Sequence, residues 1–306
     1  SIGNRSFYQC TSMTSISIPD SVQTIAEYAF YGCYSLKKIN FPKNLQTIDQ
    51  FAFSGASKLT SVSIPQGTTI GQQAFEKCTL MQLFEVDGSN TNYEAIDDVL
   101  FSKDKTKLIK YPIDKRNQSY VVPDTVTTIM MDAFTYCKYL RNLTIPSSVT
   151  SIEPSSFSYS LIQYIEVDGD IQNVAKSAFY SCRYLVSITF SHEIDTIEES
   201  AFYQCENLAT IIIPGTIKHI QNNAFAYCTS LENTPILTMT IINNYTFSYC
   251  SKLSNVSITE KVEEIGSYAF QNCFGLQSIF IPSSVKIIHS YAFVGSKIIN
   301  ITLSEG

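Results

Sequence analysis

Charged residues are scarce in this 306-residue sequence, and positive charge is the scarcer sign. Only 16% of the residues are Asp, Glu, Lys or Arg, while 44% are apolar. This balance argues against a disordered chain, because disorder goes with low hydrophobicity and high net charge. Lys and Arg number 21 against 27 Asp and Glu, which gives a net charge of −6. Without clustered cations, binding to nucleic-acid phosphates or anionic lipid is not expected.

Long hydrophobic runs and metal-binding patterns are also missing. No stretch reaches the roughly 18 apolar residues of a membrane-spanning helix, so this segment is not expected to insert into a membrane. The nine cysteines contain no C-x-x-C pair, and the closest two are 22 residues apart. Structural zinc sites need closely spaced ligand pairs. The sequence therefore predicts no metal and no cofactor.

A phenylalanine recurs along the whole sequence, and it marks an internal repeat. Every step but one between consecutive repeat phenylalanines is 22 or 23 residues. The residue before each of them is Ala, Ser or Thr, so that position admits only small side chains. The twelve repeat phenylalanines are Phe7, Phe30, Phe53, Phe75, Phe134, Phe157, Phe179, Phe202, Phe225, Phe247, Phe270 and Phe293.

Each repeat reads approximately L-x-x-I-x-I-P-x-x-V-x-x-I-x-x-x-A-F-x-x-C, as around Ile16, Ile18 and Pro19. The alternating I-x-I segment predicts a short strand, and Pro ends it because Pro cannot donate to a strand ladder. The A-F-x-x-C segment is too short for an independent α-helix, so a 3₁₀ or single-turn bend is expected there.

One repeat cannot bury its own apolar face, so repeats must stack with like strands in parallel. We therefore predict an α/β solenoid of about thirteen coils, each of 22 or 23 residues, that forms a single domain over residues 1–306. Neither end carries a capping segment, so the sequence is expected to belong to a longer repeat protein.

The exceptional step, from Phe75 to Phe134, is 59 residues long and contains an insert at about residues 87–119. Two apolar runs, 99–102 and 107–111, flank the polar turn Lys103-Asp104-Lys105-Thr106. That pattern predicts a β-hairpin. The ordinary repeat resumes at Tyr120.

The repeated A-F-x-x-C and I-x-I-P motifs resemble the BspA-like, or Treponema-type, leucine-rich-repeat family, and the resemblance covers essentially the whole chain. It implies a leucine-rich-repeat solenoid that is displayed at a cell surface or secreted by a host-associated microbe. It also implies binding to host, matrix or other microbial proteins. No site residues are carried over, because the shared motif is the core of the repeat.

Catalytic residues do not stand out. All nine cysteines fall three residues after a repeat phenylalanine, and Ala56, Ser160 or Ser296 fills that position elsewhere. The position therefore predicts a small core slot with nine free thiols. The three histidines occupy different phases of the repeat, and no nucleophile, base and acid are brought together. The segment 87–92 faintly resembles a calcium loop but lacks its glycine. A non-enzymatic protein is expected.

A partner would meet the outward side chains of the predicted strands, which are mostly Ser and Thr. Two places break that monotony, and the alternative interpretation of both is an ordinary solvated sheet. The candidate partner-binding residues are Arg141, Asn142, Gln163, Tyr164 and Glu166 near the insert, and Lys37, Lys38 and Asn40 further upstream.

Tyrosine is the more unusual feature, since twelve of nineteen lie one or two residues from a repeat phenylalanine. Stacked coils would arrange them in aromatic ladders along one rim, either as a binding surface or as a cover for the bend. The sequence thus favours a protein-binding scaffold. The alternatives are a glycan-binding module that uses the tyrosine rim, and a hydrolase with its site in the hairpin insert.

Overall fold

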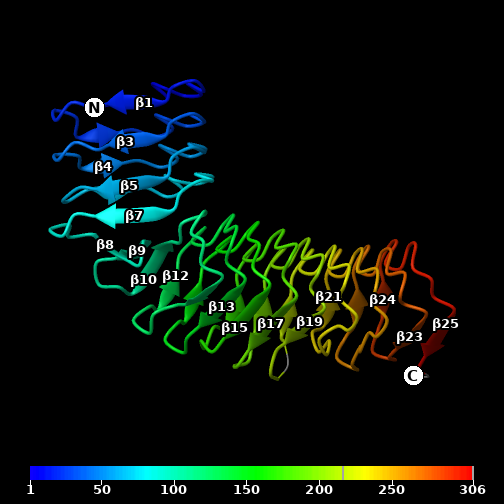
Figure 1. Ribbon diagram of the computed structural model, residues 1–306. Helices are drawn as coiled ribbons and strands as arrows, with labels where there is room; N and C mark the ends of the chain where they lie inside the picture. Colours follow the sequence, from blue (N-terminus) through cyan, green and yellow to red (C-terminus); the bar gives the residue numbers. More distant parts are fainter. Residues whose placement is uncertain (216, 305–306) are drawn as a thin grey trace. The chain divides into compact units, whose positions relative to one another are not determined.

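The computed structural model describes residues 1–215 and 217–304 and divides the chain into two compact units. Unit 1 comprises Ser1–Asn117 with Asp132–Tyr139, and unit 2 comprises Gln118–Met131 with Leu140–Gly306. In each unit the coils lie one above the next (Figure 1). The expected solenoid of about thirteen coils with stacked parallel strands is confirmed. Whether residues 1–306 behave as one domain stays a prediction.

Each ordinary coil of unit 1 contributes one strand to a main row, and most contribute a two-residue strand to a second row. The main row consists of β1 (Ser15–Ser17), β3 (Lys38–Asn40), β5 (Ser61–Ile64) and β7 (Leu83–Val86). The second row consists of β2 (Thr24–Ile25), β4 (Thr47–Ile48) and β6 (Thr69–Ile70).

Unit 2 repeats this arrangement, with like strands paired in parallel. Its main row consists of β11 (Ser119–Val121), β13 (Asn142–Ile145), β15 (Tyr164–Val167), β17 (Ser187–Phe190), β19 (Thr210–Ile212), β23 (Ser278–Ile281) and β25 (Asn300–Leu303). Its second row consists of β12 (Thr128–Ile129), β14 (Ser151–Ile152), β16 (Asn173–Val174), β18 (Thr196–Ile197), β20 (His219–Ile220), β21 (Ile241–Ile242), β22 (Glu264–Ile265) and β24 (Ile287–Ile288).

The bends differ from the sequence prediction, because the described residues contain no helix, 3₁₀ or α. Every bend has two residues in the left-handed region. One stands two positions before its phenylalanine and the other two positions after it. Around Phe202 these are Ser200, with φ 57°, and Gln204, with φ 59°. A helix needs consecutive right-handed residues, so a left-handed residue on each side of the phenylalanine excludes a helix. The α/β description is therefore wrong in its helical part.

Hydrogen bonds between coils hold the left-handed residues in place. The backbone N–H groups of Ser200, Phe202 and Gln204 donate to carbonyl groups of the following coil at 3.1, 2.8 and 2.8 Å. A left-handed conformation costs about 1 kcal/mol or more for a residue other than glycine, and these bonds offset that cost. The bend therefore depends on its neighbouring coil and would not form in an isolated repeat.

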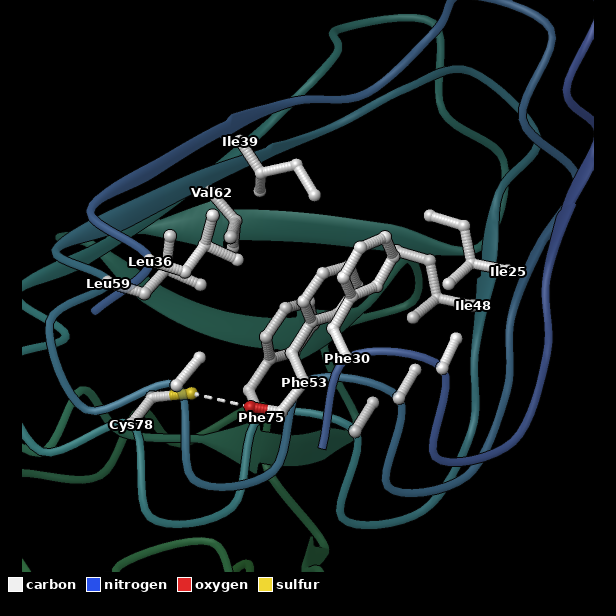
Figure 2. Close-up of a cluster of buried hydrophobic side chains, with 14 of the residues drawn as sticks. Ile25, Phe30, Leu36, Ile39, Ile48, Phe53, Leu59, Val62, Phe75 and Cys78 are labelled. Atoms are coloured by element: carbon white, nitrogen blue, oxygen red, sulfur yellow. Dashed lines mark hydrogen bonds between the residues drawn. The ribbon is translucent and has the colours of Figure 1, made fainter. Parts of the chain in front are cut away.

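The repeat phenylalanines stack in series, from Phe7 to Phe75 in unit 1 and from Phe157 to Phe293 in unit 2. Phe30 lies between Phe7 and Phe53, with ring centroids 5.1 and 5.0 Å apart and the planes within 6° of parallel. Figure 2 shows Phe30, Phe53 and Phe75 stacked, with the isoleucines of the second row on one side and Leu36 and Leu59 on the other. The apolar repeat of the sequence is thus the core of the solenoid.

The cysteine slot is a hydrogen-bonding position as well as a small one. The thiol of Cys228 donates to the carbonyl oxygen of Phe202 in the preceding coil, with S···O 3.2 Å. Cys78 does the same to Phe53 at 3.3 Å (Figure 2). The hydroxyl of Ser296 repeats the bond at 2.6 Å. This contact explains why Ser replaces Cys at this slot.

All nine cysteines carry free thiols in the structure, and only Cys10 is exposed. We therefore expect a thiol reagent to modify nine cysteines in the denatured, unreduced protein. In the native protein only Cys10 should react quickly, because a buried thiol is neither accessible nor ionised. A count clearly below nine after denaturation would mean that some cysteines are paired or oxidised.

The insert contains the predicted hairpin and one strand more. Strands β9 (Val99–Ser102) and β10 (Lys107–Lys110) pair antiparallel around the turn at 103–106. Before them, β8 (Tyr93–Ile96) pairs antiparallel with β9. The hairpin is confirmed, and β8 was missed because the four-residue segment Tyr-Glu-Ala-Ile is too short to show a clear alternation of apolar and polar residues.

Candidate binding surfaces

The candidate residues near the insert lie on β13 and β15 of unit 2 or just before them. In the parallel register Asn142 is the partner of Tyr164, and Thr144 is the partner of Glu166. Asn142, Tyr164 and Glu166 are exposed, and Tyr164 keeps 46% of its surface in solvent. The structure therefore places these three outward side chains next to each other on one sheet face.

Arg141 and Gln163 lie just before the strands and are half-buried. Arg141 uses part of its guanidinium to support the coil, since Nη1 donates to the carbonyl groups of Leu140 at 3.1 Å and Leu161 at 3.3 Å. A role for Arg141 and Gln163 in binding a partner stays a prediction. Replacing Arg141 would affect the coil as well as any contact with a partner.

Lys37, Lys38 and Asn40 are all exposed and lie on or next to β3 of unit 1. Lys38 and Asn40 point outward on either side of the buried Ile39. Their neighbours in the adjacent strand are Ser15 and Ser17, which carry no charge. This group belongs to the other unit, so it is treated as a separate candidate surface.

The strand face of unit 2, defined as the outward side of β11, β13, β15, β17 and β19, is broad and almost uncharged. Glu166 is the only charged residue among its outward strand positions. The outward residues are Ser119, Val121, Asn142, Thr144, Tyr164, Glu166, Ser187, Thr189, Thr210 and Ile212. Val121 and Ile212 are 64% and 51% exposed, so the face combines hydroxyl groups with isolated apolar side chains.

The expected tyrosine ladders are present on the bends of unit 2. One ladder runs through Tyr159, Tyr180, Tyr203, Tyr227 and Tyr249, with successive ring centroids 4.5 to 5.6 Å apart. A second runs through Tyr245, Tyr268 and Tyr291 at 4.8 and 5.1 Å. Most steps are stacked face to face. Stacking covers the ring faces, so edges and hydroxyl groups remain for a ligand.

Burial in the first ladder raises the pKa of Tyr180, Tyr203 and Tyr227, and the neighbouring phenols raise it further. These hydroxyl groups are therefore protonated at neutral pH and can donate hydrogen bonds. Sugar recognition by aromatic side chains normally uses the ring face, which the neighbouring tyrosine covers at most steps here. The ladders are better suited to covering the bends or to hydrogen bonding through their rim.

The insert is anchored to unit 1 by lysines that the sequence did not single out. The ammonium group of Lys110 donates to the Asp132 carbonyl oxygen at 2.5 Å and to Thr135 Oγ1 at 2.8 Å. Gln73 donates to the Asp132 carboxylate at 2.5 Å. Burial lowers the pKa of Lys110 and raises the pKa of Asp132, and the attraction between the two charges opposes both shifts.

Two further ion pairs fasten the same region. Lys115 contacts Asp98 at 2.6 Å, and Lys138 contacts the buried Asp114 at 3.0 Å. Lys138 also donates to the carbonyl oxygen of Thr79. These lysines all hold backbone or carboxylate oxygens. The arrangement resembles a structural clamp.

Other chemistry finds little support within residues 1–215 and 217–304. No group of three or more His, Cys, Asp or Glu there is placed to hold a metal ion. In the calcium-like segment, the carboxylate of Asp87 accepts hydrogen bonds from the Ser89 backbone at 2.9 Å and its hydroxyl at 2.5 Å. Asp87 is thus part of a local turn. The same part of the chain has no helix long and apolar enough to cross a membrane.

A shallow, open hollow in unit 1 lies between the second strand row, at β6, and the insert. It is lined by Thr69, Thr91, Asn92, Tyr93, Ser102, Lys103, Asp104 and Lys107. The Asp104 carboxylate is occupied by Ser102 and Thr106, and the Tyr93 hydroxyl accepts a hydrogen bond from the Ile70 backbone at 2.9 Å. These side chains shape the insert and leave no convergent catalytic set.

The parallel strand rows, the stacked bends and the repeated cysteine slot define the class of protein as a leucine-rich-repeat solenoid. A model of the BspA type leucine-rich repeat region, present in six copies, matches residues 1–119, 114–232 and 233–306. The chain therefore belongs to the BspA-type leucine-rich-repeat family. No match among curated proteins was found.

Solved structures of bacterial leucine-rich-repeat proteins have the same fold. A leucine-rich repeat protein from Eubacterium ventriosum is 25% identical with a TM-score of 0.72, over 97% of this chain and 80% of that one. A leucine-rich cell surface protein from Faecalibacterium prausnitzii is 30% identical with a TM-score of 0.66, over 83% and 62%. A Bacteroides ovatus protein, 22% identical over 99% and 87% with a TM-score of 0.60, supports the fold alone.

Proposed function

We propose that the chain is a non-enzymatic protein-binding scaffold, displayed at a cell surface or secreted, that binds host, extracellular-matrix or microbial proteins. The observation that carries the proposal is the strand face of unit 2, a five-stranded parallel sheet with side chains of adjacent coils in register. A stable protein interface needs about twenty residues a side, and the ten outward strand residues of this face supply about half of that number before the flanking turns are counted.

Two further features support this proposal. Four ionisable groups of the insert, Asp98, Lys110, Asp114 and Lys115, make structural contacts, which weighs against a hydrolase. The similarity to a protein described as a leucine-rich cell surface protein supports display outside the cell. The glycan-binding alternative would use the tyrosine ladders, whose ring faces are largely covered by stacking.

The partner itself is best sought by affinity capture. The purified chain, immobilised through one terminus, would be exposed to solubilised host-membrane proteins and to a panel of purified matrix proteins. Bound proteins would be identified by mass spectrometry and confirmed by direct titration. A glycan array run in parallel separates the two binding alternatives, because a glycan-binding module would bind the immobilised glycans in the absence of a protein partner. Binding to glycans alone would overturn the scaffold proposal.

Removing the side chains at the centre of the strand face should weaken binding of a captured partner. We expect Tyr164→Ala combined with Glu166→Ala to reduce affinity by about tenfold or more, because an exposed aromatic residue is a typical hot spot. The melting temperature should stay nearly unchanged, since both side chains are exposed. Titration calorimetry and thermal melts measure the two effects.

Tyr184→Ala is the matched control for loss of an aromatic side chain. Tyr184 is 51% exposed and lies on a turn, outside the strands. This variant should bind the partner as the unaltered chain does. If the partner binds the Tyr164 and Glu166 double variant with full affinity, the centre of binding lies elsewhere, and the tyrosine ladders become the next surface to test.

A further inference from the structure

The main strand row of unit 2 is interrupted after β19. From β11 to β19 each strand pairs with the next, but the following strand of that row is β23. Within the described residues, no backbone hydrogen bond joins 209–213 to 232–236 of the next coil. Elsewhere in the row, for example from Ala209 to Val186, such bonds measure about 3.0 Å. The outer edge of β19 is therefore an open seam.

Pro235 explains the interruption. It stands ten residues after its repeat phenylalanine, where the preceding coil has Ile212, a strand residue paired with Thr189. Most repeat prolines come two residues later and end the strand. A proline within the strand removes the N–H that the ladder requires.

The coil that contains Pro235 pairs with the coil after it through a bulge. Asn233 is bridged to Asn255, and Leu237 to Ile258. Three residues, 234–236, therefore lie opposite two, 256–257, which is the arrangement of a β-bulge. Within the described residues the bulge makes no backbone hydrogen bond to β19, and the two coils are joined beyond it by the bridge between Ile217 and Leu237.

The seam also exposes apolar residues. Ile212 and Ile236, on its two sides, are 51% and 57% exposed. Ile211 and Ile213 are only half-buried, although the equivalent residues of the preceding coil, Ile188 and Phe190, are buried at 0% and 2%. The neighbourhood carries almost no charge. From 207 to 217 there is no charged residue, and Glu232 is the only one from 231 to 242.

We propose that this seam is a docking site for an extended, uncharged peptide segment of a partner protein, which adds to β19 as a strand. An unpaired strand edge supplies main-chain hydrogen bonds, and alternate side chains of the added strand supply specificity. Ile212 and Ile236 offer apolar contacts on either side. The low local charge favours a neutral, β-branched segment over a charged one. This inference rests on the proposed role as a protein-binding scaffold.

A synthetic peptide with the sequence of residues 185–192, Leu-Val-Ser-Ile-Thr-Phe-Ser-His, serves as the probe. It copies β17, which already pairs with the other edge of β19. Hydrogen exchange of the full chain would be followed by mass spectrometry with and without the peptide. We expect amides of residues 209–213 to exchange at least about tenfold more slowly when the peptide is bound.

Two controls make the test specific. The same peptide N-methylated at its first serine and at its threonine lacks the N–H groups that face a preceding strand, as Ser187 faces Gln163 in the chain, and should give no protection. In the chain, Ile212→Lys with Ile236→Lys should abolish protection, while Val121→Lys, at the other end of the strand face and 64% exposed, should preserve it. All three residues are exposed enough for the variants to fold.

The proposal is overturned if the peptide protects only the exposed strand β25, or leaves the exchange of 209–213 unchanged at saturating concentration. It is also overturned if the N-methylated peptide protects equally well. The result does not depend on the natural partner. If no protein partner is captured, the proposed scaffold function is wrong, although the peptide can still bind at the seam. If the peptide does not protect residues 209–213, the seam proposal is wrong and the strand-face proposal is unaffected.

Discussion

Replacing Phe202 by alanine should destabilise unit 2 by about 3 to 5 kcal/mol, the usual cost of a large cavity in a packed core. Phe202 is fully buried, and its ring stacks between Phe179 and Phe225 at 5.1 and 5.3 Å. The deletion removes buried apolar area and also two stacking contacts. Each stacking contact is worth about 0.5 to 1.5 kcal/mol. Chemical denaturation followed by circular dichroism measures the loss.

Tyr203→Ala provides the control for this prediction. Tyr203 is the next residue and also contacts aromatic neighbours, Tyr180 and Tyr227, but it lies half-buried on the rim. Its loss should reduce the free energy of unfolding clearly less than the loss of Phe202, because folding buries less apolar surface at Tyr203 than at Phe202. Equal costs for the two variants would show that the rim ladder, and not the inner stack, holds neighbouring coils together.

The effect of Phe202→Ala should also be local at first. In a solenoid each coil contacts only its neighbours, so stability is a sum of coil and interface contributions. Hydrogen exchange should therefore accelerate most in the coils around 179–225 before the rest of unit 2 opens. Any loss of partner binding by this variant should parallel the loss of folded coils, because Phe202 itself is inaccessible.

Alkaline pH should destabilise the protein through its buried thiols. Burial raises the pKa of Cys182 to about 12, against 9.0 for a free thiol, and hydrogen bonds with Ser160 only partly oppose this. Between these values the unfolded state has lost a proton that the folded state keeps, so stability decreases as pH rises. The contribution is intact below about pH 9 and is lost progressively up to about pH 12.

The expected size is on the order of 1 kcal/mol for this thiol at pH 10, one pKa unit above the value of the free thiol. Burial raises the pKa of further cysteines in the same direction, so the combined effect is larger than that of Cys182 alone. These further cysteines are Cys33, Cys78, Cys205, Cys228, Cys250 and Cys273.

Cys182→Ser isolates the thiol from the other groups that titrate near pH 10, because those groups are the same in both proteins. Serine already occupies the equivalent slot at Ser160 and Ser296, and the Ser296 hydroxyl donates to the Phe270 carbonyl oxygen as the cysteine thiols do. Between pH 8 and pH 10 the variant should lose on the order of 1 kcal/mol less stability than the unaltered chain. An identical pH dependence of the two unfolding free energies would contradict the assignment.

The sequence alone determined the solenoid, because its evidence is periodic and local. A phenylalanine every 22 or 23 residues, with isoleucines at fixed distances, specifies which side chains face inward in every coil. The hairpin at 99–110 followed from two apolar runs around a polar turn. The tyrosine ladders followed from stacking identical coils in register. These features need only the repeat and the period of a strand.

Tertiary structure decided the conformation of the bends. A sequence such as Ala-Phe-Tyr-Gln-Cys has no glycine to announce left-handed residues, so a helical turn was the natural expectation. Hydrogen bonds to the next coil select the alternating conformation, with Gln204 donating to Ala226 at 2.8 Å. The donor role of the cysteine likewise appears only when its thiol meets the phenylalanine carbonyl of the preceding coil.

The candidate surfaces divide in the same way. The sequence located Asn142, Tyr164 and Glu166 on one outward face, since a strand alternates its side chains regularly. It could not reveal that Arg141 is partly engaged with backbone carbonyl groups, because that contact depends on a side-chain conformation in the folded coil. Nor could it reveal the seam at β19, where Pro235 was visible but its consequence depends on how two neighbouring coils pair. Local periodicity thus fixed which residues face outward, and contacts between coils decided which of them are free to bind.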